Sequence, residues 1–195
     1  MQKLIFATGN KNKFEEIKAL LPETLQILSF DDINFSEEIP ETENTIEGNA
    51  LLKARHIHKR YNLPCFADDT GLEVEALNGA PGVISSHYAG IEGASEVRAK
   101  ANMNKLLDEL AGKNNRKARF RTVIAYIDNN NNEHFFEGIV QGTITGTPSG
   151  VEGFGYDPVF MPDGYRVTFA QMSLSEKNEV SHRARAFMKF AKQFY

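Results

Sequence analysis

The hydrophobic pattern changes its period within the first part of the chain. An apolar run at 4–7 ends at the polar turn 8–10, and apolar residues then recur at helical spacing from Phe14 until Pro22. A short continuous apolar run followed by helical spacing predicts a strand, a tight turn and a helix.

Similar changes of period continue to the end of the chain, so that helices alternate with strands. The further elements predicted by these patterns are a strand at 26–30, an acidic loop at 31–42, a helix at 45–60, a buried strand at 64–67, a half-exposed strand at 72–76, a turn at 79–82, a helix at 95–110, two hairpin strands at 120–127 and 134–144 around a polar turn at 128–132, and a closing helix at 181–195.

This alternation, together with one long hairpin, indicates an α/β fold. The central sheet should be mixed, because a hairpin contributes antiparallel strands. A chain of 195 residues can bury one good core, and its composition does not demand a second domain. We therefore expect a mixed central sheet with flanking helices in a single domain over residues 1–195.

Composition narrows the classes of partner. The formal net charge is −4 with a pI near 5.8, and Lys and Arg do not gather into a basic face, so polymeric DNA or RNA is not an expected partner. Cys65 is the only cysteine, which excludes an internal disulfide and a paired-cysteine zinc site. The N-terminal apolar stretch is too short for a signal peptide, and no window approaches a membrane span. We expect a soluble, cytoplasmic protein.

Two adjacent aspartates, Asp68 and Asp69, follow the apolar run 63–67 and precede Thr70 and Gly71. Like charges at the end of a buried strand oppose each other's ionisation unless a cation lies between them, which indicates a site. Asp and Thr before Gly also form ordinary turns and helix caps. The pair alone therefore leaves a functional and a structural interpretation open.

The segment 8–13, with the sequence TGNKNK, lies between the first predicted strand and the first predicted helix. Backbone N–H groups and the positive end of the helix dipole attract phosphate at such a place, and Gly9 lets a ligand approach the backbone. Lys13 adds a mobile positive charge. The segment is neither a P-loop nor a dinucleotide-binding fingerprint, so a capped turn with solvated lysines is an alternative.

Glycines and aromatic residues alternate in the segment 153–158, GFGYDP. Such a loop can offer a ring on which a base stacks and a carboxylate that reads the base edge, although the pattern also occurs at packing corners. Lys53 and Lys177 could each be solvated surface lysines. Arg183 opens the last predicted helix and is well suited to donate hydrogen bonds to a carbonyl-bearing ring.

Taken together and in order, the motifs closely resemble the inosine/xanthosine triphosphate pyrophosphatase family. Each motif is weak alone, but their order and spacing over nearly the whole chain are specific. The matching motifs are Thr8-Gly9-Asn10-x-x-Lys13, Asn49-Ala50-x-x-Lys53-Ala54, Ala67-Asp68-Asp69-Thr70-Gly71-Leu72, Gly79-x-Pro81-Gly82, Phe154-Gly155-Tyr156-Asp157-Pro158, Glu176-Lys177 and Ser181-His182-Arg183.

The resemblance implies an elongated, two-lobed α/β homodimer with a cleft between the lobes. It implies hydrolysis of nucleoside triphosphates to the monophosphate and pyrophosphate with Mg²⁺. The preferred substrates would be purines with a keto group at position 6, namely ITP, dITP and XTP. Such an enzyme clears deaminated bases from the nucleotide pool.

The resemblance also implies a role for each matching residue. Asp69 would be the general base and a magnesium ligand, with Asp68 and Glu41 supporting the acidic cluster. Thr70, which stands where Ser is frequent, would contact the substrate. The residues expected to hold the triphosphate are Thr8, Gly9, Asn10, Lys11, Asn12, Lys13, Lys53 and Lys177, and those expected to take the base are Phe154, Gly155, Tyr156, Asp157, His182 and Arg183.

One position departs from the family pattern. Many bacterial members carry Glu immediately before the Asn-Ala pair, where this chain has Gly48, and Glu47 stands one position earlier. One residue of helix is a rotation of about 100°, so Glu47 cannot simply replace that carboxylate. The set of carboxylates around the metal, including Glu41, is therefore open.

Three functional hypotheses follow. The first is the pyrophosphatase, in which adjacent aspartates at a strand terminus share one divalent ion that faces lysines from three stretches of chain. A donor such as Arg183 would select O6 of the base over the amino group of adenine, a mismatch worth ~1–3 kcal/mol. The second is a non-catalytic nucleotide sensor. The third is a related pyrophosphatase that acts on damaged or modified pyrimidine nucleotides, as the Maf-like enzymes do.

Overall fold

The computed structural model describes residues 2–22 and 24–194. The strands in this part of the chain are β1 (Gln2–Phe6), β2 (Leu25–Leu28), β3 (Cys65–Val74), β4 (Pro81–Gly82), β5 (Lys117–Ile127), β6 (Glu133–Ile144) and β7 (Phe160–Pro162). The α-helices are α1 (Lys11–Lys18), α2 (Ile46–Tyr61), α3 (Ser95–Glu109), α4 (Leu174–Val180) and α5 (His182–Ala191). Short 3₁₀ helices lie at Glu75–Leu77, Ser85–His87, Asp157–Val159, Phe169–Gln171 and Lys192–Phe194.

The strands form a mixed sheet with the hydrogen-bonded order β2-β1-β3-β5-β6-β7, and β4 pairs with β3. β1 runs parallel to both β2 and β3. β4 is antiparallel to β3, and β7 is antiparallel to β6. The predicted α/β class, with a mixed sheet and flanking helices, is confirmed.

The chain divides into two compact units. Unit 1 consists of residues 1–69, 122–138 and 183–195, and unit 2 consists of residues 70–121 and 139–182. β3, β5 and β6 contribute residues to both units.

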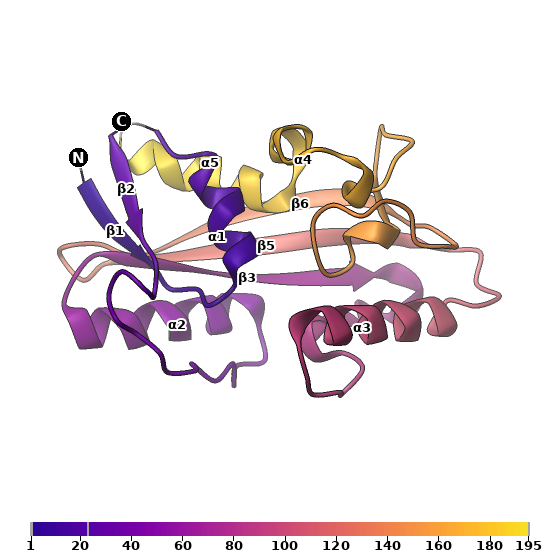
Figure 1. Cartoon of the computed structure of the whole chain (residues 1–195), viewed down its shortest axis with the longest axis horizontal. Coiled ribbons are helices and arrows are strands. Elements are labelled where there is room, and N and C mark those ends of the chain that lie inside the picture. The colour runs from indigo at the N-terminus through magenta and orange to yellow at the C-terminus, as the bar shows by residue number, and fades with distance from the viewer. Residues whose placement is uncertain (1, 23, 195) are drawn as a thin grey trace. The chain divides into compact units, whose positions relative to one another are not determined.

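In unit 1, the alternation of side chains along the strands supplies two apolar faces. The ring of Phe66 packs between those of Phe6 and Phe190 of α5. Its centroid lies 4.5 Å from that of Phe6 and 4.8 Å from that of Phe190. The next residue in β3, Ala67, packs instead with Ala54 of α2. Figure 1 shows α1 and α5 on one side of these strands and α2 on the other. Burial of one such phenylalanine contributes about 1.5–3 kcal/mol.

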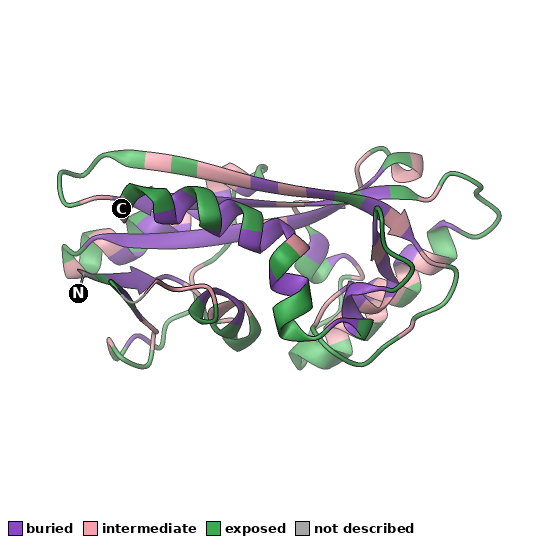
Figure 2. Cartoon of the chain, turned by 90° about the horizontal axis from the view of Figure 1, so that it is seen from above, coloured by how far each residue is buried: buried purple, intermediate pink, exposed green. Residues whose placement is uncertain are grey.

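Unit 2 has its own core, in which side chains of β3, β5 and β6 pack against α3 and against the segment 154–172. Phe120 of β5 contacts the rings of Phe160 and Phe169, with centroids 4.6 and 6.1 Å apart. The outward turns of the helices are exposed, whereas most strand residues are buried (Figure 2).

Local capping explains where the helices of unit 1 begin and end. The side chain of Asn10 accepts hydrogen bonds from the first turn of α1, and Thr45 accepts one from the N–H of Gly48 at the start of α2. Asn62 ends α2 in the left-handed conformation, at φ 50°. The thiol of Cys65 lies against α2 and donates to the carbonyl of Ala54 at 3.2 Å.

Several predicted boundaries differ from the structure, and β5 begins at Lys117, three residues before its predicted start. The two strands predicted at 64–67 and 72–76 are one continuous strand, β3, so the aspartates lie inside a strand and not at its terminus. α1 ends at Lys18, before the predicted end at Pro22, and β2 begins and ends earlier than predicted. The last helix is preceded by α4, which the sequence patterns missed, and Tyr195 at its predicted end lies outside the described residues. None of the described helices is long and apolar enough to cross a membrane.

Candidate active site

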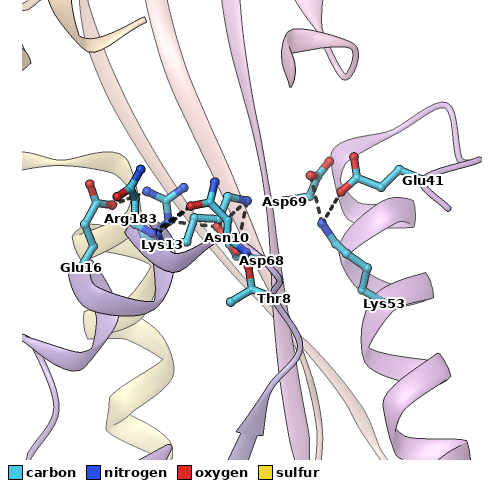
Figure 3. Close-up of polar contacts among 10 residues, drawn as sticks. Thr8, Asn10, Lys13, Glu16, Glu41, Lys53, Asp68, Asp69 and Arg183 are labelled. Atoms are coloured by element: carbon cyan, nitrogen blue, oxygen red, sulfur yellow. Dashed lines mark hydrogen bonds and ion pairs between the residues drawn. The ribbon is translucent and has the colours of Figure 1, made fainter. Parts of the chain in front are cut away.

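Asp68 and Asp69 lie on opposite faces of β3, because successive residues of a strand point to opposite sides. Asp68 faces the side of α1 and α5, as Phe66 does, and Asp69 faces the side of α2, as Ala67 does. Figure 3 shows the two carboxylates directed away from each other, each with a lysine of its own. The prediction that they share one cation is therefore wrong.

Asp68 belongs to a buried ion-pair network. Its carboxylate accepts from Lys13 Nζ, at 3.2 Å to Oδ1 and 3.1 Å to Oδ2, and from Arg183 Nε at 3.0 Å. The guanidinium of Arg183 also donates to Glu16 of α1. Asp68 and Arg183 are 1% and 2% exposed, whereas the side chain of Lys13 is 14% exposed.

The charges around Asp68 decide its protonation state. Burial alone raises the pKa of this carboxyl, but the positive charges of Lys13 and Arg183 outweigh burial and hold the pKa below its usual range. Asp68 and Glu16 in turn raise the pKa of Arg183 against the effect of burial. Burial lowers the pKa of Lys13, against the opposing effect of Asp68. The carboxylate of Asp68 and the guanidinium of Arg183 thus stabilise each other's charged forms.

Asp69 has a more open set of contacts on the α2 side. Lys53 Nζ, which projects from α2, donates to Asp69 Oδ1 at 3.2 Å and to Glu41 Oε1 at 2.7 Å. Oδ2 of Asp69 has no hydrogen-bond partner among the described residues, although Asp69 is only 5% exposed. A buried carboxylate oxygen without a partner is costly, so it marks a place for a ligand or a reacting water.

Burial raises the pKa of Asp69, and the nearby carboxylates Glu41 and Asp68 raise it further, against the opposing effect of Lys53 and Lys13. Burial lowers the pKa of Lys53, but its two carboxylate partners outweigh this and raise it overall. A raised pKa makes a carboxylate a stronger proton acceptor.

Some of the backbone N–H groups that were predicted to bind phosphate before α1 already donate to side chains of the same segment. The side chain of Asn10 accepts from the N–H groups of Asn12 at 3.0 Å and Lys13 at 3.2 Å, and the N–H of Asn10 donates to Thr8 Oγ1 at 3.2 Å. Lys11 and Asn12 are exposed. A Cβ added at Gly9 would meet nothing within 4 Å, so the fold itself does not require glycine there.

In unit 2, Lys177 of α4, which was predicted to hold the triphosphate, contacts the predicted base-binding loop. Its ammonium donates to Asp157 Oδ2 at 2.6 Å and lies 5.0 Å from the ring centroid of Phe154. Asp157 Oδ2 also accepts from the N–H of Phe154 at 2.8 Å. A side chain at Gly153 would collide with Asp157 Oδ2 at 2.1 Å, and its φ of +72° favours glycine, so this residue lets the loop close on its carboxylate.

Tyr156 and His182 are also buried within unit 2. The hydroxyl of Tyr156 donates to the carbonyl of Ser85 at 2.9 Å, so this ring anchors the loop to the turn that carries Ser85. The ring of His182 stacks on Phe120, with centroids 4.5 Å apart and an interplanar angle of 19°. Thr70 is the first residue of unit 2 and is half-buried.

Comparison with known proteins identifies the family. The sequence model of the Ham1 family matches residues 4–193. The chain belongs to the Ham1 family. A dITP/XTP pyrophosphatase of Flavobacterium psychrophilum is 55% identical over 183 residues, or 94% of each chain. One of Porphyromonas gingivalis is 54% identical over 187 residues, or 95% of this chain and 94% of the relative.

Solved structures of Ham1 proteins have the same fold. The Coxiella burnetii protein is 35% identical and covers 100% of this chain and 98% of its own, with a TM-score of 0.87. The Staphylococcus aureus protein is 34% identical and covers 99% and 97%, with a TM-score of 0.85.

The donors beside Lys53 in this Ham1-family chain fit a magnesium ion. Mg²⁺ prefers hard oxygen ligands, keeps several waters and is usually held by one or two carboxylates together with substrate phosphates. Asp69 and Glu41 supply that number of carboxylates, and Asp69 Oδ2 is an oxygen without a partner among the described residues. No group of three or more His, Cys, Asp or Glu side chains in the described residues could hold a metal, so a full protein cage is absent there.

Asp68 of this Ham1-family chain was predicted to be a metal ligand, but Lys13 and Arg183 already engage both of its oxygens. Arg183 was predicted to read the base. It is buried in unit 1 and donates to Asp68 and Glu16, and its role towards the base stays a prediction. Sequence reasoning missed Glu16 because a glutamate on a short helix is usually solvated. Its signal is its place three residues after Lys13, on the same side of α1.

Gly48 is explained by its surroundings. A Cβ at this position would lie 2.7 Å from Glu43 Cβ and 2.9 Å from Thr45 Oγ1, so glycine allows the segment before α2 to fold against the helix. The N–H of Glu43 donates to the side chain of Asn49 at 2.9 Å, which fixes the same segment. Glu41 lies at the start of this segment and reaches Lys53.

Proposed function

We propose that this chain is a nucleoside triphosphate pyrophosphatase that converts ITP, dITP and XTP to the monophosphate and pyrophosphate. Its relatives of 55% and 54% identity are named dITP/XTP pyrophosphatase. The observation that carries the proposal is the buried Asp69 carboxylate, which has one oxygen without a partner among the described residues and a lysine on the other.

We propose Mg²⁺ as the cofactor, with Asp69 and Glu41 as its protein ligands. When bound, the ion would neutralise phosphate oxygens and lower the pKa of a coordinated water. Asp69 would accept the proton of the water that attacks the α-phosphorus. Lys13 and Lys53 would offset the negative charge of the phosphates.

We propose that the base contacts the Phe154–Asp157 loop together with Lys177 and His182. The ammonium of Lys177 beside the ring of Phe154 is a hydrogen-bond donor suited to a 6-keto oxygen. The 6-amino group of adenine would present a second donor instead, a mismatch worth ~1–3 kcal/mol. Tyr156 would position this loop through Ser85 and would not stack on the base.

The deciding experiment is a substrate panel. Purified protein is incubated with Mg²⁺ and, separately, with ITP, XTP, dITP, dATP, dGTP and dUTP, and pyrophosphate release is measured. Release from the first three at rates well above the others supports the proposal. No release from any nucleotide would favour a nucleotide sensor, and preferential release from dUTP would favour a pyrimidine-directed enzyme.

We also propose a homodimer in the cytoplasm, which stays a prediction from the family resemblance. Sedimentation velocity at micromolar protein is the direct measurement of the oligomeric state. A monomer under these conditions would remove the dimer and leave the proposed chemistry unchanged.

A further inference from the structure

The Lys53 ammonium bridges two carboxylates that come from different segments of unit 1. Nζ lies 2.7 Å from Glu41 Oε1, in the segment before α2, and 3.2 Å from Asp69 Oδ1, on β3 (Figure 3). The second oxygen of Asp69 has no hydrogen-bond partner among the described residues. A cation bound by both carboxylates would therefore take the position that the ammonium now holds.

We propose that the Lys53 ammonium competes with the divalent cation for this position, so that the metal binds strongly only when a triphosphate draws Lys53 away. This inference rests on the proposed function, because it takes Glu41 and Asp69 as metal ligands and a nucleotide triphosphate as the acceptor of Lys53. It adds a coupling that the proposed function does not require, in which one side chain links the affinities for metal and nucleotide.

Charge and distance support the competition. Mg²⁺ holds its oxygen ligands at about 2.0–2.1 Å, closer than the ammonium holds these carboxylates, so both cations cannot share the space. Two positive ions within a few ångströms also repel each other strongly in a buried site. With Lys53 in place, its positive charge offsets part of the negative charge of the two carboxylates, so they attract a metal ion less strongly.

The side chain of Lys53 is able to move. Its ammonium is carried on a flexible four-carbon stem, and 11% of the side chain is exposed. A triphosphate offers several anionic oxygens to such a group. Because binding free energies are linked reciprocally, a nucleotide that removes Lys53 from the carboxylates must raise the affinity for metal.

The test measures Mn²⁺ binding without catalysis. Free Mn²⁺ is followed by electron paramagnetic resonance during titration of the wild type, Lys53→Met and Lys59→Met, in the absence of nucleotide. Lys53→Met should bind Mn²⁺ at least about tenfold more tightly than the wild type, because the competing cation is gone. Lys59→Met loses the same charge from an exposed position of α2 and should change the affinity by less than about threefold.

A second titration compares the coupling between nucleotide and metal in the wild type and in Lys53→Met. Mn²⁺ affinity is measured with and without an ITP analogue that has a methylene group between its α- and β-phosphorus atoms, and binding of Mn²⁺ by the analogue alone is subtracted. The phosphates of the analogue supply metal ligands in both proteins, so the analogue should tighten Mn²⁺ binding in both, but much less in Lys53→Met, where no ammonium remains to be displaced. If Lys53→Met does not fold, as judged by circular dichroism, Lys53→Gln, which also removes the charge, takes its place.

Three results would overturn the inference. They are unchanged or weaker Mn²⁺ binding by the folded Lys53 variant, equally tightened Mn²⁺ binding in the two lysine variants without nucleotide, and an effect of the analogue that is as large in the Lys53 variant as in the wild type. If any of these results is obtained and pyrophosphate is still released from ITP, the competition is rejected and the proposed pyrophosphatase function is retained. Absence of pyrophosphate release in the substrate panel rejects the proposed function separately.

Discussion

On each side of β3 in unit 1, an aspartate contacts a lysine, but the two aspartates differ in how many of their oxygens have partners. On the side of α1 and α5, Asp68 has both oxygens engaged by Lys13 and Arg183. On the side of α2, Asp69 shares one lysine with Glu41 and keeps one oxygen without a partner among the described residues. The alternation of a strand is enough to give neighbouring carboxylates separate environments.

These environments move the two pKa values apart. Lys13 and Arg183 lower the pKa of Asp68 in spite of burial, whereas burial and nearby carboxylates raise the pKa of Asp69. A pair of acids whose pKa values diverge in this way is typical of sites where one group stays charged and the other exchanges protons. We therefore assign stability to the Asp68 side and chemistry to the Asp69 side.

The largest effect is expected from Asp69→Asn. Loss of the general base should lower kcat/KM for ITP by about 10²–10⁴-fold. The free energy of unfolding should change by less than about 1 kcal/mol, since the amide removes a partly desolvated charge and Lys53 keeps its contact with Glu41. Pyrophosphate release and urea unfolding measure the two quantities. An active Asp69→Asn protein would contradict the assigned role.

Asp68→Asn is the matched variant on the other side of the strand. It removes the negative partner of Lys13 and Arg183, and breaking such a buried network costs about 3–5 kcal/mol of unfolding free energy. Urea unfolding of both asparagine variants gives the comparison directly. Equal stability of the two would show that the Asp68 side has no special structural role.

The pH dependence of stability should separate the two sides further. Because the folded-state pKa of Asp68 is lower than its unfolded value, its contribution is fully present above a pH of about 4 and is lost as the pH falls towards the folded value. The stability difference between wild type and Asp68→Asn should therefore shrink between pH 5 and pH 2. Urea unfolding at several pH values tests this, and parallel stability curves would contradict it.

The smallest effect is expected from Gly9→Ala, which probes the segment before α1. A Cβ there meets nothing within 4 Å, so the unfolding free energy should change by no more than about 0.5 kcal/mol. If a phosphate approaches the backbone at Gly9, kcat/KM should fall by about tenfold, or ~1.4 kcal/mol.

Gly146→Ala is the control for Gly9→Ala, because a Cβ at Gly146 also meets nothing within 4 Å and this glycine belongs to no predicted site. It should leave both kcat/KM and stability unchanged. Equal kinetic behaviour of the two alanine variants would argue against a phosphate at Gly9.

The sequence predicted the main helices and strands because each has a clear apolar period. It also indicated Asp69, Lys53 and Lys13 as site candidates, and these three lie in one region of unit 1. It could not predict that β3 continues through both aspartates, since Asp-Asp-Thr-Gly has the composition of a turn. That continuity depends on pairing with distant strands, which a local pattern does not contain.

The same limit explains why the partners of Arg183 were not predicted. They are Glu16 and Asp68, which are far from it in the sequence and reach it only through packing of α1, α5 and β3. An arginine near the start of a helix gave no sign of burial. The ion pair between Lys177 and Asp157 was hidden for the same reason, although each residue was a site candidate by itself.

The buried thiol of Cys65 has a practical consequence. Burial raises its pKa to about 12, so it stays protonated and unreactive towards maleimides at neutral pH. A cysteine introduced on the exterior would thus be labelled alone, without removal of the natural one. Fluorescent or spin labels can report movements of the otherwise unaltered chain during nucleotide turnover.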